Sequence, residues 1–315
     1  MIVTLTPNPS VDHAVVLDSF KRGGVLRAID ARLDAGGKGV NVSRALAAND
    51  AETVAVVPVG GHQGHLLADL LGETGVNHRD VPISGAIRMN VSVLEPCGTT
   101  TKLNEPGPVL STSEAQAMVD ATLTAANGAA WVAVCGSLPP GVSTDIYAAL
   151  ADRVRARGAR FAVDSSGLPL RAAVETRPNL IKPNHEELAE LVGHQLPTLS
   201  DVLAAARELV SSGIQIVAVS LGSDGALLAT KDEAVHARAT ITTPVSTVGA
   251  GDCMLAGLLH GLASDLPISE ALVGGVAWGS AAVALPGSSV PTPDDVRRVA
   301  PTLSPELPLS LELGH

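Results

Sequence analysis

Residues 247–252 have the sequence Thr-Val-Gly-Ala-Gly-Asp, and an apolar helical run follows them directly. Glycines permit a tight turn, so the motif predicts that the backbone N–H groups of its glycine pair point at one spot. At the start of a helix such a spot binds anions. Asp252 in the first turn either caps the helix as a dipole-stabilised carboxylate or acts as a base beside a bound phosphate.

Outward from this motif, short β-branched runs alternate with longer runs rich in Ala and Leu. Strands separated by helices of about 10–15 residues indicate βαβ units, so we expect an α/β fold with a mostly parallel sheet. The expected strands are 2–6, 53–59, 131–135, 161–164, 180–182 and 216–220. The expected helices are 39–49, 62–74, 143–157, 253–262, one beginning near Asn184, one from Thr198 to Gly213, and one capped by Ser113 and ended by Gly128.

Residues 11–34 and 84–105 break the alternation, because each segment predicts strands with no helix between them. Within the second, Pro96-Cys97-Gly98 suits a type I turn, so a hairpin is expected. We expect the two segments to form a small sheet that covers a cleft as a lid; the alternative is an edge decoration of the main sheet. The whole prediction is one α/β domain over residues 1–315 with a discontinuous β lid.

A second glycine-rich stretch, Gly-Gly-Lys-Gly-Val-Asn-Val at residues 36–42, opens the first expected helix. Glycines let a ligand approach the backbone, Lys38 offers a cation, and Asn41 offers both a donor and an acceptor. The stretch is not a P-loop, because Gly39 follows the lysine where Ser or Thr is required. The alternative is a plain glycine-rich turn into a helix.

Polar residues follow the first strand and lie on the expected hairpin. Asp12 can accept two sugar hydroxyls or form an Asx turn after Pro9. Arg88 and Asn90 are two residues apart and share one strand face, and Lys102 lies on the other arm of the hairpin. Because guanidinium groups match phosphate oxygens, this face suits a phosphate. Ordinary solvated charge is the alternative.

Two more motifs follow expected strands. Ser-Leu-Gly-Ser-Asp-Gly at residues 220–225 either holds a nucleotide phosphate or makes the turn into the next strand. Asn184 and Glu187 are three residues apart at a helix start, which is the spacing of a capping box. The same pair can order water around a Mg²⁺ ion that is bound to phosphates.

Composition excludes several classes of protein. The net charge of −11 has the wrong sign for binding nucleic acid or a membrane surface, and 2% aromatic residues offer few stacking platforms. No apolar run reaches the roughly 18 residues of a membrane span, and the first residues predict a strand and not a signal peptide. Three cysteines without Cys-x-x-Cys spacing disfavour zinc and disulfides and fit the cytoplasm. Residues 21–44 carry six basic and two acidic side chains, a local +4 suited to anions.

Four motifs in this order carry a family resemblance: Gly-Gly-Lys-Gly-Val-Asn-Val, Lys-Pro-Asn-x-x-Glu, Ser-Leu-Gly-x-x-Gly and Thr-Val-Gly-Ala-Gly-Asp. The chain resembles the ribokinase-like carbohydrate kinases of the phosphofructokinase B type over about residues 1–290, and within them the bacterial 1-phosphofructokinases. The closer likeness rests on residues 5–12, 87–91, 99–104 and 136–141. The resemblance implies a three-layer sandwich with a mostly parallel central sheet and a small β lid.

The resemblance also implies roles for individual residues. Asp252 would be the general base, with an anion hole formed by Gly249, Ala250 and Gly251. The sugar phosphate would contact Asp12, Gly37, Lys38, Asn41, Arg88, Asn90, Lys102 and Ser137, and Arg27 would reach a neighbouring subunit's site. ATP would contact Asn184, Ser220, Gly222, Ser223, Gly225, Thr247 and Ser280. Glu187 would hold the Mg²⁺ water shell, a monovalent cation such as K⁺ is a further expected cofactor, and the lid would form a homodimer.

The implied reaction is ATP-dependent phosphorylation of fructose 1-phosphate at its 6-hydroxyl, giving fructose 1,6-bisphosphate. Tagatose-6-phosphate kinase and 6-phosphofructokinase activity are the alternatives within the family. Val25 stands where some relatives that phosphorylate fructose 6-phosphate carry a lysine, which favours fructose 1-phosphate.

Two remote alternatives lie outside the kinases. A nicotinamide-dependent oxidoreductase needs Gly-x-Gly-x-x-Gly after its first strand, but Pro7-Asn8-Pro9 follows here. The later glycine run has Met254 where the third glycine belongs. A non-catalytic sugar-phosphate sensor needs no base at Asp252.

Overall fold

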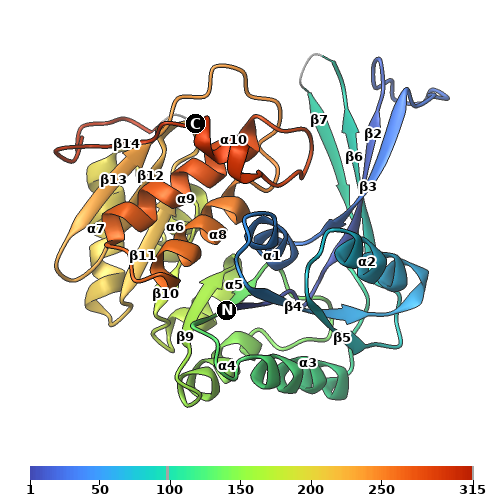
Figure 1. The fold of residues 1–315 in the computed structure, drawn as a ribbon, viewed down its shortest axis with the longest axis horizontal. Coiled ribbons are helices and arrows are strands. Elements are labelled where there is room, and N and C mark those ends of the chain that lie inside the picture. Colours follow the sequence, from blue (N-terminus) through green and yellow to red (C-terminus); the bar gives the residue numbers. More distant parts are fainter. Residues whose placement is uncertain (97–98, 314–315) are drawn as a thin grey trace.

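A ten-stranded sheet forms the centre of the protein in the computed structural model, which describes residues 1–96 and 99–313 (Figure 1). The strands from β5 to β11 are parallel, and β12, β13 and β14 extend one edge in antiparallel fashion. The sequence therefore predicted the sheet correctly. The order is β14 (Thr302–Leu303), β13 (Ala234–Arg238), β12 (Ala226–Ala229), β11 (Ile216–Ser220), β10 (Leu180–Ile181), β9 (Arg160–Asp164), β8 (Trp131–Cys135), β1 (Ile2–Leu5), β4 (Thr53–Val59) and β5 (His78–Pro82).

Side chains of the central strands alternate between two apolar cores. In β1, Val3 and Leu5 belong to one core together with Val132 of β8. Ile2 belongs to the other core together with Trp131. Successive residues of a strand point to opposite faces, so a strand that is covered on both sides must be apolar almost throughout. This is why these short runs carry so few polar residues.

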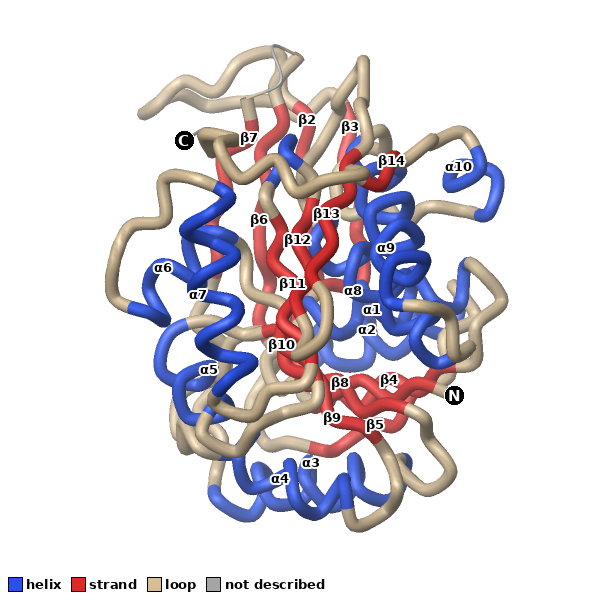
Figure 2. Tube along the Cα trace, turned by 90° about the vertical axis from the view of Figure 1, so that its left-hand side faces the viewer, coloured by secondary structure: helices blue, strands red, loops and turns tan. Residues whose placement is uncertain are grey.

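Helices cover both faces of the sheet and complete three layers (Figure 2). One layer contains α1 (Lys38–Ala48), α8 (Ala250–Ala263) and α9 (Ile268–Val283), with α10 (Pro293–Arg297) against α9. The other layer contains α3 (Thr112–Ala125), α4 (Ile146–Arg155), α5 (Gly167–Val174), α6 (His185–Val192) and α7 (Leu199–Ser211). Helix α2 (Gly61–Glu73) packs on β4 and β5. Among the described residues, no helix has the length and apolar character that crossing a membrane requires.

Helices α8 and α9 approach closely because glycines face one another across their contact. A β-carbon at Gly257 would lie 2.9 Å from the carbonyl oxygen of Gly274, and one at Gly279 would lie 3.0 Å from that of Ala250. Larger side chains at these positions would push the helices apart. The close contact at Ala250 holds the beginning of α8 against α9.

Four further strands form a second, separate sheet, which we call the small sheet. Its order is β3 (Asp30–Gly36), β2 (Ser10–Val16), β6 (Arg88–Leu94) and β7 (Thr100–Asn104). It projects from one end of the body (Figure 1), so the alternative of an edge decoration of the main sheet is wrong. The turn predicted at Pro96, Cys97 and Gly98 includes residues 97–98, which lie outside the described residues.

Helix α3 begins two residues earlier than its predicted cap. Ser113 was the expected N-cap, but the cap is Ser111, whose Oγ accepts the N–H of Glu114 at 3.3 Å. The Glu114 carboxylate in turn accepts the N–H of Ser111 at 2.7 Å. Ser111 lies three residues before Glu114, as a reciprocal capping box requires, and Ser113 does not.

Candidate active site

The beginning of α8 has the geometry that residues 247–252 predict. Gly249 is the N-cap and adopts a left-handed backbone with φ of 76°, a conformation that glycine reaches without steric cost. Asp252 lies in the first turn and is only 8% exposed. N–H groups in a first helical turn have no partner within the helix, and the helix dipole favours negative charge there. A buried carboxylate therefore lies beside an anion-binding helix terminus.

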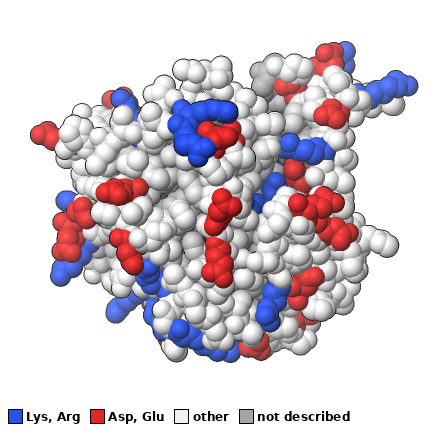
Figure 3. Space-filling view, viewed as in Figure 1, with Lys and Arg blue, Asp and Glu red and all other residues white. Residues whose placement is uncertain are grey.

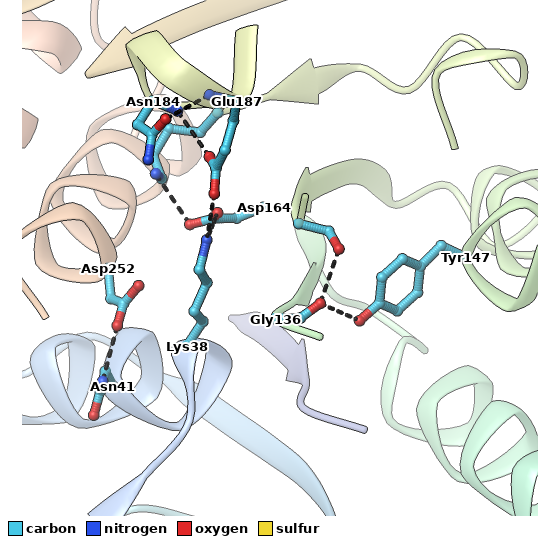
Figure 4. A network of polar contacts seen from close by, with 10 residues as sticks. Lys38, Asn41, Gly136, Tyr147, Asp164, Asn184, Glu187 and Asp252 are labelled. Atoms are coloured by element: carbon cyan, nitrogen blue, oxygen red, sulfur yellow. Dashed lines mark hydrogen bonds and ion pairs between the residues drawn. The ribbon is translucent and has the colours of Figure 1, made fainter. Parts of the chain in front are cut away.

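Asn41 of α1 donates its Nδ2 hydrogen bond to Oδ2 of Asp252 at 2.8 Å (Figure 4). Burial raises the pKa of Asp252 to about 6, and the Asp164 carboxylate adds to the shift; Lys38, Asn41 and Lys182 act against it. A carboxyl group with such a pKa is ionised near neutrality and still basic enough to accept a proton, as a general base requires. Capping alone does not need this environment.

Asp164 at the end of β9 is fully buried between two lysines. Its Oδ1 lies 2.8 Å from Nζ of Lys38, and its Oδ2 lies 3.1 Å from Nζ of Lys182. Although burial raises the pKa of Asp164, the two ammonium groups hold it below its usual range. Burial by itself would lower the pKa of Lys38, but the surrounding carboxylates raise it overall. The cluster thus keeps its charges in an interior site.

Asn184 and Glu187 form the capping box of α6, and Glu187 also faces the cluster (Figure 4). Asn184 Oδ1 accepts the N–H of Glu187 at 2.7 Å, and Glu187 Oε2 accepts that of Asn184 at 2.8 Å. The other oxygen, Oε1, lies 3.4 Å from Nζ of Lys38. The structural and the functional interpretation of this spacing are therefore compatible.

The motifs at residues 182–187 and 220–225, which are expected to contact ATP, lie at the carboxyl ends of β10 and β11. Ser220 forms a parallel β-bridge with Asn184, which places the two motifs side by side. Gly222 and Gly225 have positive φ angles of 61° and 87°, and the short helix η1 (Gly222–Asp224), which includes Ser223, makes the turn into β12. A turn is thus present; whether it holds phosphate remains a prediction.

Thr247 and Ser280 come from different segments that meet near the start of α8. Residue 247 is exposed in the loop before α8, and the N–H groups of Val245 and Ser246 both bond the carbonyl of Val283. Ser280 lies three residues before Val283 in α9 and next to Gly279, which touches Ala250. The loop and the end of α9 therefore frame one side of the helix terminus.

On the small sheet, Asp12 lies inside β2 and not in an Asx turn after Pro9, so that alternative is wrong. The ladder places Asp12 between Asp34 and Asn90. Its Oδ1 accepts hydrogen bonds from Ser10 Oγ at 2.6 Å and from Asn90 Nδ2 at 3.0 Å. A β-carbon at position 36 would collide with this carboxylate, so glycine there keeps room for it.

Residues 6–295 match the family model described as pfkB family carbohydrate kinase. The chain belongs to this family. It is therefore a phosphotransferase with an alcohol acceptor, and its α/β architecture is the ribokinase-like fold. Family membership excludes the nicotinamide-dependent oxidoreductase and disfavours a sensor without catalysis.

Relatives of known name are similar over nearly their whole length. The chain is 39% identical to 1-phosphofructokinase of Rhodobacter capsulatus over 96% of each chain. It is 38% identical to ATP-dependent 6-phosphofructokinase isozyme 2 of Mycobacterium tuberculosis over 94% of this chain and 88% of that one. Phosphofructokinase-2 from Escherichia coli, solved with substrates and products, has a TM-score of 0.90 at 35% identity and covers 94% of this chain and 97% of its own. That protein has also been solved with potassium and as an inhibited tetramer.

Some expected sugar-phosphate residues of this kinase have partners within the protein. Arg88 donates to the carbonyls of Asn8 at 3.0 Å and Glu105 at 3.1 Å, and burial lowers its pKa. Ser137 accepts from Nδ2 of Asn8 at 3.4 Å. Gly37 is the N-cap of α1. These positions surround the start of β2 and of α1.

Lys102 and Arg27 are not brought to the buried cluster. Lys102 is exposed on β7, and Arg27 is exposed in the connection between β2 and β3. Within residues 1–96 and 99–313, no ion pair joins either of them to Asp252, Asp164 or Glu187. Any contact of theirs with the substrate must come from the small sheet or from another subunit.

The motif analysis missed Asp164 and Lys182. Lys182 opens the Lys-Pro-Asn-x-x-Glu motif, from which only Asn184 and Glu187 were predicted to act, and it is 3% exposed. Asp164 ends a predicted strand, and ligands bind at the carboxyl ends of parallel strands. That rule was available for Asp164, but nothing local distinguishes it from other acidic residues.

The predicted positive segment is not one patch. Lys21 and Arg22 are exposed on the small sheet's connection, whereas Arg44 and Lys38 are paired with Asp34 and Asp164. On the face in Figure 3 the charges are scattered, and the basic group over α10 pairs with acidic residues of that same helix. The excess positive charge of the segment is therefore divided between exposed side chains of the connection between β2 and β3 and Lys38, which pairs with the distant carboxylates of Asp164 and Glu187, and its role in binding anions stays a prediction.

Proposed function

We propose that this kinase transfers the γ-phosphoryl group of ATP to the 6-hydroxyl of fructose 1-phosphate, giving ADP and fructose 1,6-bisphosphate. The observation that carries the proposal is the carboxylate of Asp252, buried in the first turn of α8 with a pKa of about 6. Asp252 accepts the proton of the hydroxyl as the sugar oxygen bonds the γ-phosphorus. The bond from that phosphorus to the β-phosphate oxygen breaks, and ADP leaves.

The anion hole consists of backbone N–H groups of Gly249, Ala250 and Gly251 at the start of α8. Lys182 supports this role, because a β-carbon at Gly251 would lie 3.5 Å from its Nζ. An ammonium group and a helix terminus at one point stabilise negative charge that develops on a transferring phosphoryl group. Both are preorganised here, since Asp164 fixes Lys182.

A divalent ion fits this site when it arrives bound to phosphates. Asp164 and Glu187 supply carboxylates, yet each already faces an ammonium group, and no cluster of three or more metal-ligating side chains exists among the described residues. Mg²⁺ keeps several waters and binds through one or two carboxylates together with phosphates. We assign the water-mediated contact to Glu187. A bound Mg²⁺ would supply charge neutralisation to the phosphates of ATP.

The sugar phosphate lies, in this proposal, between the small sheet and α1. Asp12, Gly37, Lys38 and Asn41 bind hydroxyl groups, as their hydrogen-bond partners and positions support. Arg88, Asn90 and Lys102 bind the phosphate that does not react, and Ser137 also contacts the substrate. The nucleotide lies across Asn184, Ser220, Gly222, Ser223, Gly225, Thr247 and Ser280.

The choice of fructose 1-phosphate does not rest on overall identity. Relatives named 1-phosphofructokinase and 6-phosphofructokinase isozyme 2 are 39% and 38% identical, so this measure does not separate the two substrates. Val25 supports the choice, because this apolar residue is 90% exposed where some fructose 6-phosphate kinases carry a lysine. Without that cation, one candidate contact for a 6-phosphate is missing.

We further propose a homodimer through the small sheet, which acts as a lid. Exposed apolar side chains support this, namely Leu33 and Leu103 on the sheet and Phe20, Val25 and Ile29 in the connection between β2 and β3. Arg27, in the connection between β2 and β3, would reach the active site of the partner subunit. We place the enzyme in the cytoplasm, in keeping with the free, buried thiols of Cys135 and Cys253, and we include K⁺ as a candidate activator beside Mg²⁺–ATP.

A coupled assay of ADP release tests the proposal with fructose 1-phosphate, fructose 6-phosphate and tagatose 6-phosphate at equal concentrations. We expect kcat/KM for fructose 1-phosphate to exceed the others by about tenfold or more, equivalent to roughly 1.4 kcal/mol. A higher kcat/KM for fructose 6-phosphate would make the protein a 6-phosphofructokinase. Absence of sugar-dependent ADP release with all three would remove the substrate proposal.

A further inference from the structure

Arg44 of α1 is a buried cation that none of the proposed roles uses. The residue is 7% exposed, and the two N–H bonds of its Nη1 are shared among three acceptors within hydrogen-bond distance. These are the carbonyl of Ala35 in β3 at 3.0 Å, the carbonyl of Ser288 after α9 at 3.2 Å, and Oδ1 of Asn41 at 3.3 Å. Burial lowers the pKa of Arg44, with Asp34 opposing the shift, so the protein keeps this guanidinium at a cost.

The contact with Asn41 decides which end of that amide faces the base. An asparagine amide presents an acceptor on one side and a donor on the other. Arg44 has only donors, so its contact with Oδ1 leaves Nδ2 directed at Asp252, where the donor–acceptor distance is 2.8 Å. A flipped amide would put its oxygen against the carboxylate and its NH₂ group against a guanidinium, and both contacts would be repulsive.

The small sheet anchors the other side of Arg44. Nη2 lies 3.8 Å from Oδ1 of Asp34, whose Oδ2 accepts a hydrogen bond from Nε of Arg32 at 2.8 Å. Arg32 also donates from Nη2 to the carbonyl of Pro286 at 3.2 Å. Strand β3 and segment 286–288 are thereby joined to each other and to Arg44. The guanidinium is held from two sides before it reaches Asn41.

We propose that Arg44 is a positioning residue that aims the amide donor of Asn41 at the carboxylate of Asp252, with β3 and segment 286–288 as its anchors. The inference rests on the proposed role of Asp252 as base. It assigns Arg44 no contact with substrate. Its effect on the reaction is to keep the base ionised at lower pH, because a hydrogen bond to the charged form of a carboxyl group favours that form.

Several charged and titratable groups surround Asp252 and belong in any account of its titration. They are Lys38 from α1, Cys135 at the end of β8, Asp164 at the end of β9, Lys182 after β10, and Cys253 in α8 itself, and Arg44 lies behind Asn41. Arg44→Lys keeps the positive charge and replaces the planar guanidinium, whose Nη1 faces the three acceptors while Nη2 faces Asp34, with a single ammonium group. A change in titration in this variant therefore reports the geometry at Asn41 and not a change in net charge.

The test is the pH profile of kcat/KM for the sugar phosphate in the full-length enzyme. We call the fall of kcat/KM at low pH the acid limb of the profile. In Arg44→Lys we expect the midpoint of the acid limb to move up by about half to one pH unit, since part of the hydrogen bond from Asn41 to the ionised Asp252 is lost. Activity should fall several-fold near pH 6 and return to within about threefold of wild type near pH 8.5, where Asp252 is ionised in both. An equal loss at every pH would show a merely structural role and overturn the proposal.

A matched control and a double variant sharpen the result. Arg160 stacks on Trp131 and donates to the carbonyl of Leu262 at 2.9 Å, so Arg160→Lys also loosens a partly buried arginine. It should lower the melting temperature without moving the acid limb. Asn41→Ala should raise the midpoint of the acid limb at least as far as Arg44→Lys does. The double variant Asn41→Ala/Arg44→Lys should raise it no further, because Arg44 acts through Asn41. Independent shifts in the double variant would overturn the proposal.

Asp252→Asn separates this inference from the proposed function. If Asp252→Asn loses activity while Arg44→Lys leaves the limb in place, the base stands and the positioning role of Arg44 fails. If Asp252→Asn keeps its activity and its acid limb, the proposed function fails, and the inference fails with it.

Discussion

The body of the protein, which is the ten-stranded sheet with its helices, and the small sheet both consist of short strands, but the strands of the body are much more deeply buried. All five residues of β8 in the body are buried, whereas four of the five residues of β7 in the small sheet are exposed. Helices cover the body strands on both faces, whereas the small sheet projects from one end of the body and contacts α1 and α2. The body can therefore hold charges in a fixed, dry arrangement, while the small sheet still has a face to cover with a substrate or a second subunit.

The polar groups of the two regions differ in the same way. In the body, Asp164 is fully buried and forms ion pairs with the partly buried Lys38 and the buried Lys182. In the small sheet, Asp12 accepts hydrogen bonds from neutral donors and is half-buried. Ions that are paired in a low-dielectric interior act strongly on a reacting centre, and half-exposed groups act mainly on binding. Variants in the body should therefore affect kcat, and variants in the small sheet should affect KM.

The largest expected effect comes from Asp252→Asn. Asparagine keeps the size and can still cap α8, but it cannot accept a proton. Removal of a general base lowers kcat by about 10²–10⁴-fold, or roughly 3–5 kcal/mol, and the sugar KM and melting temperature should change little. Steady-state kinetics and thermal unfolding measure these quantities, with Asp265→Asn beyond the end of α8 as control. A kcat within about threefold of wild type would mean that Asp252 only caps the helix.

Core packing in the body should dominate stability. Leu5→Ala opens a cavity at a fully buried position of β1 and should lower the free energy of unfolding by about 2–5 kcal/mol. Leu103→Ala on β7, which is 58% exposed, should change it by no more than about 0.5 kcal/mol. Urea unfolding at one protein concentration compares them. Equal losses would show that the small sheet is as tightly covered in solution as the body.

Loss of a cation on the small sheet should act on binding. Lys102→Ala should raise KM for the sugar phosphate by about tenfold while KM for ATP and kcat stay within about twofold, because the contact is made equally before and during the reaction. Initial rates with each substrate varied in turn give the three constants. Lys231→Ala, an exposed lysine in the connection between β12 and β13, is the control. Equal rises in both KM values would place Lys102 outside the sugar-phosphate site.

The smallest expected effect is the pH dependence of the wild-type enzyme. Asp252 must be deprotonated to accept a proton, and its pKa is raised to about 6 by burial and by Asp164. Activity should therefore fall as pH decreases through about 6, reaching half near that value. The acid limb should be absent from the residual activity of Asp252→Asn. If the activity of the wild-type enzyme fell only near pH 4, the pKa of Asp252 would not be raised in the working enzyme, which would indicate that its carboxyl group is solvated when substrate binds.

Much of the fold followed from local pattern. The bounds predicted for residues 53–59, 131–135 and 216–220 agree with β4, β8 and β11, because strands buried on both faces leave continuous apolar runs. The start of α8 was predicted from Gly249, Gly251 and Asp252, because a glycine turn and an acidic first turn are signals of a helix N-terminus. Ser113 was wrong as a cap because the reciprocal partner, Glu114, lies three residues after Ser111.

The amino-acid sequence by itself determined the α/β class, the separate strands of the small sheet and the candidate base at Asp252, because periodicity, glycine turns and helix caps act over a few residues. Only the tertiary structure decided which charges meet. Asn41 bonds Asp252 across 211 residues, and Lys38 pairs with Asp164 across 126. Such partners are chosen by how the sheet and helices pack, since burying a charge is tolerable only where an opposite charge or a donor lies within reach.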